Sequence, residues 1–311
     1  MSPARVKHHR VSRFRSKYTK KNFNFKGVFF VLFLVVFLVV LFVALTLILN
    51  KDKINMVVRG EAGEIYVSSF DFEAKKITTF VIPPTAELEV SRSLGKWKAK
   101  SLWQLSMNEK LGGALLSETV TRDFHFPTFL WADSLAQGFS DGKVATPFLS
   151  LFAPYKTNLG MLDKLRLFFI ALTVKNFDRE LIDLSKTSYL RKTKLADGED
   201  GYVVTKNLPQ ELIYVFAESL INKKETRVEI IDLTGTYGVG ESVGATIEVL
   251  GAKILATTKG PSDDSDCIVL GKDSTVVGKI AKVFSCEQGK GSAEDRFDIQ
   301  IKIGKKFAQR F

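Results

Sequence analysis

Residues 28–49 read VFFVLFLVVFLVVLFVALTLIL, and the rest of the 311-residue chain is organised around this stretch. It carries no charge and a single hydroxyl, that of Thr46. A helix of this length spans roughly 33 Å, whereas the hydrocarbon core of a bilayer is about 30 Å thick. A strand would leave its backbone groups unpaired in lipid, and no polar face recurs to suit a buried helix of a globular domain. The stretch therefore predicts one transmembrane helix.

The charges beside this helix predict its orientation. Residues 1–27 contain nine Arg and Lys and no Asp or Glu, while the residues after the helix mix both signs, as in Lys51, Asp52 and Lys53. The positive-inside rule places the N-terminus in the cytoplasm and the chain from about residue 51 outside. A cleaved signal peptide would need a shorter apolar core and a small-x-small exit, which LNKDKINMV lacks. We expect an uncleaved signal anchor in the cell membrane.

Net charge limits the partners. The formal charge is +11, of which the tail supplies nine, so the exterior part is close to neutral. Without a basic surface, the exterior gives no electrostatic reason to bind nucleic acid. The tail interleaves its cations with aromatic residues such as Phe14 and Tyr18, which could stack on nucleic acid bases. The simpler interpretation is a topology signal lying on anionic membrane lipid.

About 260 residues follow the helix, enough for two modest α/β domains. We place them at residues 50–222 and 223–311, behind the cytoplasmic tail 1–27. In the first domain, EIYVSSFDFEAKKITTFVIPP, residues 64–84, predicts a β-hairpin that stops at its prolines. Two helices follow, one over 98–111 and one over 113–122, with Gly112-Gly113 between them.

Residues 158–174 predict an amphipathic core helix. Asn158 precedes the apolar run and is a residue type that caps helix N-termini. Four residues at helical spacing are expected to face the core: Leu162, Leu165, Phe169 and Leu172.

The second domain has the element order β-α-β-β-α-β. Its strands are expected at RVEIIDL, AKILATT, CIVLG and FDIQIKIG, and its first helix ends at Gly251. This order matches the split βαβ pattern of ferredoxin-like sandwiches.

That order brings Cys267 and Cys286 to one end of the sheet. Cys267 begins the third strand, and the helix 274–284 then runs back, so that Cys286 returns to the same end. A disulfide needs Cα atoms about 4.4 to 6.8 Å apart, and an oxidising exterior would permit one. Two unpaired thiols that merely pack are the alternative.

The second domain resembles the C-terminal domain attached to many LytR/CpsA/Psr-type (LCP) cell-envelope proteins. The resemblance is carried by VEIIDLTGTYGVGESVGATIEVLGAKIL, residues 228–255, and FDIQIKIGKKFA, residues 297–308. The family pattern is a strand with an Asn-Gly-Thr-like turn, a glycine before the helix, a glycine at the helix end and a closing strand into a glycine. Here these positions are taken by Asp232, Gly235, Gly238, Gly251 and Gly304.

The first domain, from Glu64 to about Asp133, resembles a degenerate version of the family's catalytic domain. Its second strand ends VIPPTA where the family has Ser-Ile-Pro-Arg-Asp-Thr, so Pro84 and Thr85 stand at the arginine and aspartate positions. The family's Arg-Ser-Asp falls on residues 61–63, and its Lys-Ile-Asn … Gly-Gly resembles the stretch from Lys100 to Gly112-Gly113. In the family, these arginines bind a polyprenyl pyrophosphate and the aspartates hold a divalent metal. Both residue types are missing from the two aligned motifs.

Other motifs point to no cofactor. GTYGVGESVG, residues 235–244, departs from the dinucleotide fingerprint because Val243 takes the third glycine position. DDSDC, residues 263–267, lacks the spacing of a calcium loop. His125 is the only histidine beyond the helix and sits among aromatic residues, so no Ser-His-Asp triad can be formed. We assign no catalytic residue and no metal ligand.

A basic cluster is the one candidate for binding a phosphate headgroup or an anionic wall polymer; an ordinary basic loop is the alternative. Its members are Arg92, Lys96, Lys98 and Lys100.

These features predict an extracytoplasmic protein of the cell envelope that binds during wall or surface-polymer assembly rather than catalysing. Its expected partners are membrane lipid and a cell-wall glycopolymer or polyprenyl pyrophosphate. Two alternatives stay open. One is an active phosphotransferase, with Mg²⁺, that moves glycopolymer from polyprenyl pyrophosphate to the wall. The other is a purely structural, membrane-tethered interaction module.

Overall fold

The computed structural model describes residues 52–205, 209–291, 293 and 296–311, together with residues 30, 33–35 and 37–38 of the N-terminal segment. The chain divides into two compact units, residues 1–49 and 50–311. Most of the expected transmembrane helix, residues 28–49, lies outside the described residues. Within the ranges just given, the structure has no helix with the length and apolarity needed to cross a membrane.

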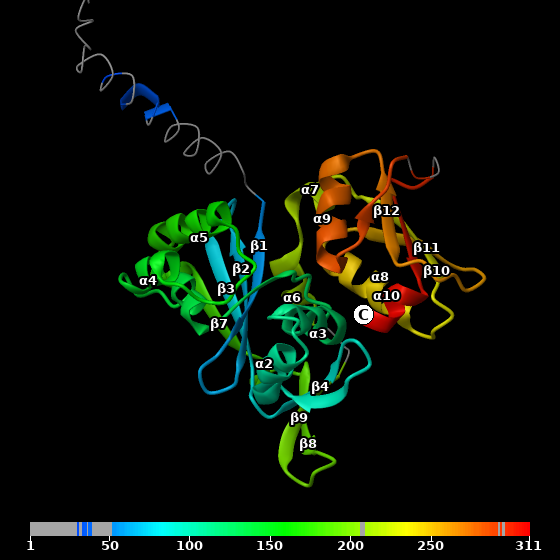
Figure 1. Cartoon of the computed structure of the whole chain (residues 1–311), viewed down its shortest axis with the longest axis horizontal. Coiled ribbons are helices and arrows are strands. Elements are labelled where there is room, and N and C mark those ends of the chain that lie inside the picture. Colours follow the sequence, from blue (N-terminus) through cyan, green and yellow to red (C-terminus); the bar gives the residue numbers. More distant parts are fainter. Residues whose placement is uncertain are drawn as a thin grey trace, which may run out of the picture. The chain divides into compact units, whose positions relative to one another are not determined.

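The second unit is built on a five-stranded sheet of order β6-β1-β2-β3-β7 (Figure 1). Its strands are β1 (Ile54–Arg59), β2 (Ile65–Asp71), β3 (Lys76–Ile82), β6 (Leu130–Ala132) and β7 (Arg179–Asp183). β2 and β3 form the predicted antiparallel hairpin, with Ile65 opposite Ile82. β1 was not predicted from the sequence, because its apolar run begins only five residues after the end of the membrane stretch at Leu49.

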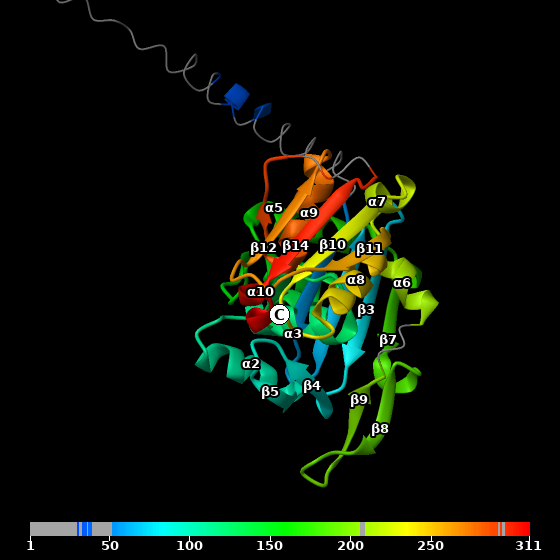
Figure 2. The same cartoon turned by 90° about the vertical axis from the view of Figure 1, so that its right-hand side faces the viewer.

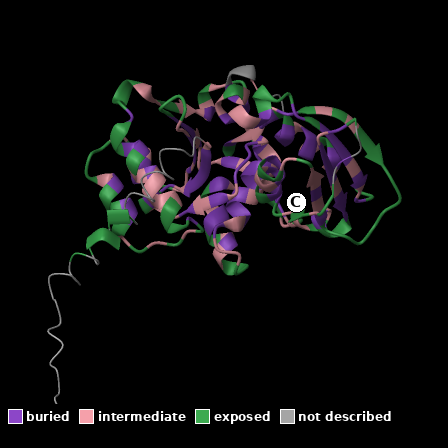
Figure 3. Ribbon diagram, turned by 90° about the horizontal axis from the view of Figure 1, so that it is seen from above, coloured by how far each residue is buried: buried purple, intermediate pink, exposed green. Residues whose placement is uncertain are grey.

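Helices cover both faces of this sheet. One face packs against α2 (Ala99–Asn108), α3 (Ala114–Phe124) and α6 (Gln210–Phe216), and its core contains the stacked rings of Phe80, Phe126 and Phe216. The other face packs against the 3₁₀ helix η1 (Ser134–Phe139), α4 (Thr146–Phe152) and α5 (Met161–Thr173). β1, β2 and β3 therefore bury side chains on both sides, and Figure 3 shows buried residues gathered inside the layers. The two helices predicted around Gly112-Gly113 are confirmed as α2 and α3.

The helix expected over 158–174 is present as α5, but two details of the prediction are wrong. Gly160 takes the N-cap position, and the Asn158 side chain instead bonds the backbone of the neighbouring strand at Trp131 and Phe129. The face containing Leu162 and Phe169 is exposed, while Leu167 and Ile170 pack on the sheet. The helix is apolar on two sides, so helical periodicity alone could not select the buried one.

A second, four-stranded sheet has the order β5-β4-β9-β8. It consists of β4 (Ala86–Val90), β5 (Gly95–Lys98), β8 (Leu190–Lys194) and β9 (Asp200–Val204). Short 3₁₀ helices, η2 (Asn176–Asp178) and η3 (Leu184–Lys186), flank β7 and connect the two sheets. The segment 95–100, for which the sequence left an ordinary basic loop as an alternative, is thus strand β5 running into α2.

The C-terminal part has its own core and the predicted element order. Its strands are β10 (Arg227–Leu233), β11 (Lys253–Lys259), β12 (Cys267–Gly271), the short β13 (Glu287–Gln288) and β14 (Ile299–Gly304). Its helices are α8 (Val239–Val249), α9 (Ser274–Phe284) and α10 (Lys305–Arg310), and α7 (Ser219–Lys223) leads into it. Gly251 follows the α8 C-cap with φ of 95°, as the prediction of a C′ glycine requires.

The ferredoxin-like strand order is wrong. The sheet order is β11-β10-β14-β12-β13, and β10 pairs directly and in parallel with β11 (Figure 2). A split βαβ unit would place another strand between these two. The connection from β11 to β12 is too long for a tight hairpin, and it crosses the ends of β10 and β14, where Asp263 N donates to Leu233 O and Gly304 N donates to Asp266 O. β12 therefore pairs on the far side of β14.

Cys267 and Cys286 form a disulfide with their Cα atoms 4.9 Å apart. Cys267 is the first residue of β12, and Cys286 precedes β13, which pairs in parallel with β12. The return of the chain through α9 thus brings the two residues together at one end of the sheet. The boundary at residues 222 and 223 stays a prediction.

Candidate functional site

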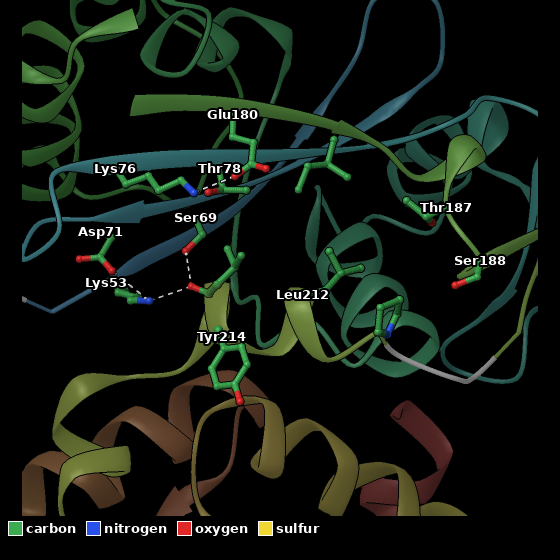
Figure 4. Close-up of a pocket in the computed structure, with 13 residues that line it drawn as sticks. Lys53, Ser69, Asp71, Lys76, Thr78, Glu180, Thr187, Ser188, Leu212 and Tyr214 are labelled. Atoms are coloured by element: carbon green, nitrogen blue, oxygen red, sulfur yellow. Dashed lines mark hydrogen bonds and ion pairs between the residues drawn. The ribbon is translucent and has the colours of Figure 1, made fainter. Parts of the chain in front are cut away.

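A groove of about 890 Å³ opens beside α6 on the face of the first sheet formed by β2, β3 and β7 (Figure 4). This volume lies in the range of small-molecule sites, about 300 to 1,000 Å³. The register explains which strand residues line it: Ser69 lies opposite Thr78, and Asp71 lies opposite Lys76. Side chains alternate along a strand, so these four point to one face.

The groove's lysines are already paired. Lys53 Nζ lies 3.0 Å from Asp71 Oδ2 and donates to the carbonyl of Val215 at 2.8 Å. Lys76 Nζ lies 2.8 Å from Glu180 Oε2 on β7. Each cation is matched by one carboxylate, so the groove carries no surplus positive charge for a pyrophosphate.

The Lys53 contact also holds the groove together. Its side chain is 9% exposed, and both it and the Ser69 hydroxyl donate to the carbonyl of Val215 near the end of α6. The start of β1 and the middle of β2 are thereby tied to the helix that forms the opposite wall.

Hydroxyl groups dominate the remaining polar lining. Thr187 and Ser188 lie at the end away from Lys53, and Thr78 lies on the sheet (Figure 4). Tyr214 stands at the rim with 72% of its surface exposed, although aromatic side chains usually bury most of their area. An exposed ring beside hydroxyls suits a ligand with apolar C–H faces and many hydroxyl groups of its own.

No nucleophile in the groove is placed for activation among the described residues. The Ser69 hydroxyl donates to a carbonyl oxygen and not to a base. His125 lies at the α3 C-cap rather than in this lining. The arrangement can hold a ligand through hydrogen bonds and a ring face, and it positions no general base on a hydroxyl.

The predicted basic cluster is elsewhere, around the β4–β5 hairpin and the start of α2. Arg92 makes two bonds of 2.8 Å to the Glu118 carboxylate, which raise the pKa of its guanidinium. Lys98 bonds Asp197 and Glu199, and these bonds raise its pKa. Lys96 lies 3.8 Å from Glu87, and Lys100 is exposed on α2. The four lie within a nine-residue segment of the sequence, and none of them lines the groove.

The structure does bring the two family-like motifs together. Residues 61–63 form the turn between β1 and β2, and the backbone N–H of Lys100 donates to the carbonyl of Pro84 just after β3. A Cβ on Gly63 would lie 2.6 Å from Lys100 Cβ, so the turn and α2 are in close contact.

The donors at these positions do not fit the divalent metal that the resemblance implies. Glycine and threonine stand where the family has carboxylates, and hard cations take oxygen ligands mainly from Asp and Glu. Across the ranges that the structure describes, no three His, Cys, Asp or Glu side chains gather into a metal-binding group.

Sequence reasoning missed the groove. A usable signal was present in β2 and β3, where the buried hydroxyl residues Ser69 and Thr78 share one face of the sheet with Asp71 and Lys76. Buried hydroxyls facing one side of a sheet indicate a polar cavity there. The wall supplied by α6 could not be foreseen, because it lies more than 100 residues further along the chain.

No protein-family model and no curated protein matches the chain. Among solved structures, B. subtilis TagT is 14% identical, with 50% of this chain and 86% of that chain covered and a TM-score of 0.36. B. subtilis TagV is 10% identical, with 50% and 92% covered and a TM-score of 0.35. A LytR-CPS2A-psr family protein, YwtF (TagT) with bound octaprenyl pyrophosphate lipid, is 13% identical, with 53% and 88% covered and a TM-score of 0.34. These structural neighbours are LCP-family proteins that cover about half of the chain at low identity.

Proposed function

We propose that this chain is a membrane-anchored, extracytoplasmic protein of the LytR/CpsA/Psr type that binds a wall or surface glycopolymer and does not transfer it. In this proposal residues 28–49 are the anchor, a degenerate catalytic domain holds the polymer in the groove beside α6, and a LytR-type C-terminal domain completes the chain. The family assignment rests on the sequence resemblance given above.

The observation that carries the binding proposal is the charge and lining of the groove. Lys53 and Lys76 are each paired with a carboxylate, so a pyrophosphate would have to compete with an existing ion pair. For the Lys53–Asp71 pair, whose side chains are 9% and 20% exposed, this competition is costly, because breaking a buried pair leaves a charge without its partner. A hydroxyl-rich ligand has no such cost, because it can bond Thr78, Thr187 and Ser188 and lay one face on Tyr214.

The test is binding to the full chain in lipid nanodiscs. The ligands are purified bacterial wall glycopolymer fragments and, separately, undecaprenyl pyrophosphate with and without Mg²⁺. Glycopolymer binding should be saturable and insensitive to Mg²⁺. Tyr214→Ala should weaken it about fivefold, since loss of a stacking face is worth about 1 kcal/mol.

The matched control is Tyr237→Ala. Tyr237 is 93% exposed and lies in the turn before α8, outside the groove lining. This substitution should leave the affinity unchanged. Mg²⁺-dependent tight binding of the pyrophosphate, or its turnover, would overturn the proposal in favour of an active transferase. Failure of every polymer and lipid carrier to bind would favour the structural module.

A further inference from the structure

The outer surfaces of α4 and α5 form an exposed apolar face. Its seven members are between 43% and 73% exposed, and we call them the α4–α5 face: Phe148, Leu149, Phe152, Met161, Leu162, Phe169 and Leu172. Surface apolar residues that stand singly need no explanation, whereas a group of large ones on neighbouring helices marks a contact surface.

The face is continuous across the two helices. The rings of Phe148 on α4 and Phe168 on α5 meet edge to face at 4.9 Å between centroids. On α5, positions 162, 165, 169 and 172 form one helical stripe, and Leu165 within it is half-buried. The opposite side of α5 carries the buried Leu167 and Ile170. A helix that is apolar on both sides has a second surface to cover.

Chain connectivity limits how far this face can lie from the proposed anchor. Arg166 on α5 donates from Nη2 to the backbone carbonyl of Asp52 at 2.8 Å. Asp52 follows Leu49, the last residue of the apolar stretch, by only three residues. Three residues of extended chain reach about 10 Å. The surface of a bilayer that contains residues 28–49 would therefore lie close to α5.

Lysines and aromatic rings border the face in the way membrane-interface proteins use them. Lys164 Nζ lies 4.2 Å from the ring centroid of Tyr155, and Lys175 Nζ lies 5.4 Å from that of Phe177. Phe177 is itself 79% exposed. Such side chains can keep their charge at the headgroups while their apolar parts lie deeper.

We propose that the α4–α5 face lies in the headgroup and upper acyl region of the same bilayer into which residues 28–49 insert. The occupant of the face is lipid, and the proposal rests on the anchor in the proposed function. Docking would hold the exterior unit against the membrane at a second point. The binding surface would then be orientated with respect to the membrane, instead of turning freely about the short connection after Leu49.

The test places a fluorophore on the face in the full chain. The two natural cysteines are bonded to each other, so an introduced cysteine is the only free thiol under non-reducing conditions. Leu162→Cys on α5 and Leu149→Cys on α4 are each labelled with nitrobenzoxadiazole and reconstituted into nanodiscs of phosphatidylglycerol and phosphatidylethanolamine. Leu255→Cys on β11 is the matched control, because Leu255 is 54% exposed and Leu162 is 57% exposed.

Emission from positions 162 and 149 should be blue-shifted and should be quenched by lipids spin-labelled high on the acyl chain, while position 255 should show neither effect. Water-like emission at both face positions in a membrane-integrated chain would overturn the docking alone. A blue shift that lipid does not quench, and that vanishes at one chain per disc, would replace lipid by a second copy of the chain. Release of the chain by alkaline carbonate would overturn the anchor, and with it the proposed function.

Discussion

Gly113 lies where two helices and two tryptophan rings meet. It precedes α3, and a Cβ built on it would lie 2.3 Å from Trp131 Cε3 and 2.9 Å from Trp103 Cζ3. The two rings already pack edge to face at 6.1 Å between centroids, so neither can withdraw without disturbing the other. The Gly-Gly pair that marked a helix boundary in the sequence is therefore also a packing requirement.

We predict that Gly113→Ala lowers the free energy of unfolding by about 1 to 3 kcal/mol, as overpacking of a filled core does. Urea unfolding of the full chain in detergent, followed by tryptophan fluorescence, measures it. Gly278→Ala is the control, because its Cβ would meet only side-chain atoms of Gln288, at 3.6 Å or more, and it lies inside α9, where alanine is favourable. Equal midpoints for Gly113→Ala and the unsubstituted chain would contradict the packing argument.

The disulfide gives a second prediction at the scale of single residues. Cys267 and Cys286 are 19 residues apart in the chain, and closing a loop of that size stabilises the folded state by about 3 kcal/mol on the chain-entropy model. We expect the double variant Cys267→Ser, Cys286→Ser to lose about that much in urea unfolding. A thiol count on the denatured, non-reduced chain should find no free thiol, and two thiols per chain would disprove the bond.

At the scale of elements, α9 is held to the residue pair before β1 and to the loop before α7 by one half-buried lysine. Lys279 Nζ lies 2.7 Å from Asp52 Oδ1 and 2.9 Å from Glu218 Oε2. Burial raises the pKa of Glu218 above its ordinary value of 4.5, and the attraction of Lys279 only partly offsets this. The folded chain therefore holds the Glu218 proton more tightly than the unfolded chain does.

The raised pKa of Glu218 determines how the stability of the fold changes with pH. The stability that Glu218 contributes is complete below pH 4.5 and is lost as the pH rises through its native pKa. Glu218→Gln should remove this loss, so the variant should gain in Tm relative to the unsubstituted chain as the pH rises through that window. Glu225→Gln is the contrast: its bond to Lys253 lowers the pKa of Glu225, so its contribution is lost as the pH falls. Parallel pH profiles for the two variants would contradict the argument.

The elements that sequence reasoning found are those with a strong local pattern. The β2–β3 hairpin, α2, α3 and α8 each combine one clear apolar face with a turn or glycine at the boundary. α5 was found as a helix but turned the wrong way, because Leu162 and Phe169 form as good an apolar stripe as Leu167 and Ile170 do. Which stripe is buried depends on the partner sheet, and that partner is assembled from strands distant in the sequence.

The missed parts depend on long-range pairing. β4 and β5 are short strands of a local hairpin, and β5 carries Lys96 and Lys98, so its segment looked like a loop; the other neighbour of β4 is β9, which lies more than 100 residues further along the chain. In the C-terminal sheet the element order was confirmed while the strand order was wrong, since element order does not state on which side of β14 the strand β12 pairs. The groove could not be predicted because it depends on two features that the sequence pattern does not state. These are the register of β2 against β3 and the wall that the distant helix α6 supplies.

At the scale of the whole molecule, the proposed anchor divides the chain between two compartments. The tail of residues 1–27 carries nine cations and no anion, whereas the described part of the chain pairs many of its lysines and arginines with carboxylates. Moving one positive charge outward against an inside-negative potential costs about 2.3 kcal/mol per 100 mV. For the whole tail this amounts to roughly 20 kcal/mol, so the orientation with the tail inside is strongly favoured.

We therefore predict that a protease added outside intact cells digests the C-terminal part and spares the tail. The full chain carries one epitope tag before Met1 and another after Phe311, and each is followed by immunoblot. After permeabilisation both tags should be lost, which controls for intrinsic resistance of the tail. Replacing the nine basic residues of the tail by Gln should weaken the preference and yield some chains with the C-terminal tag protected. Digestion of the tail in intact cells, with the C-terminal tag preserved, would show that the charge argument assigns the wrong orientation.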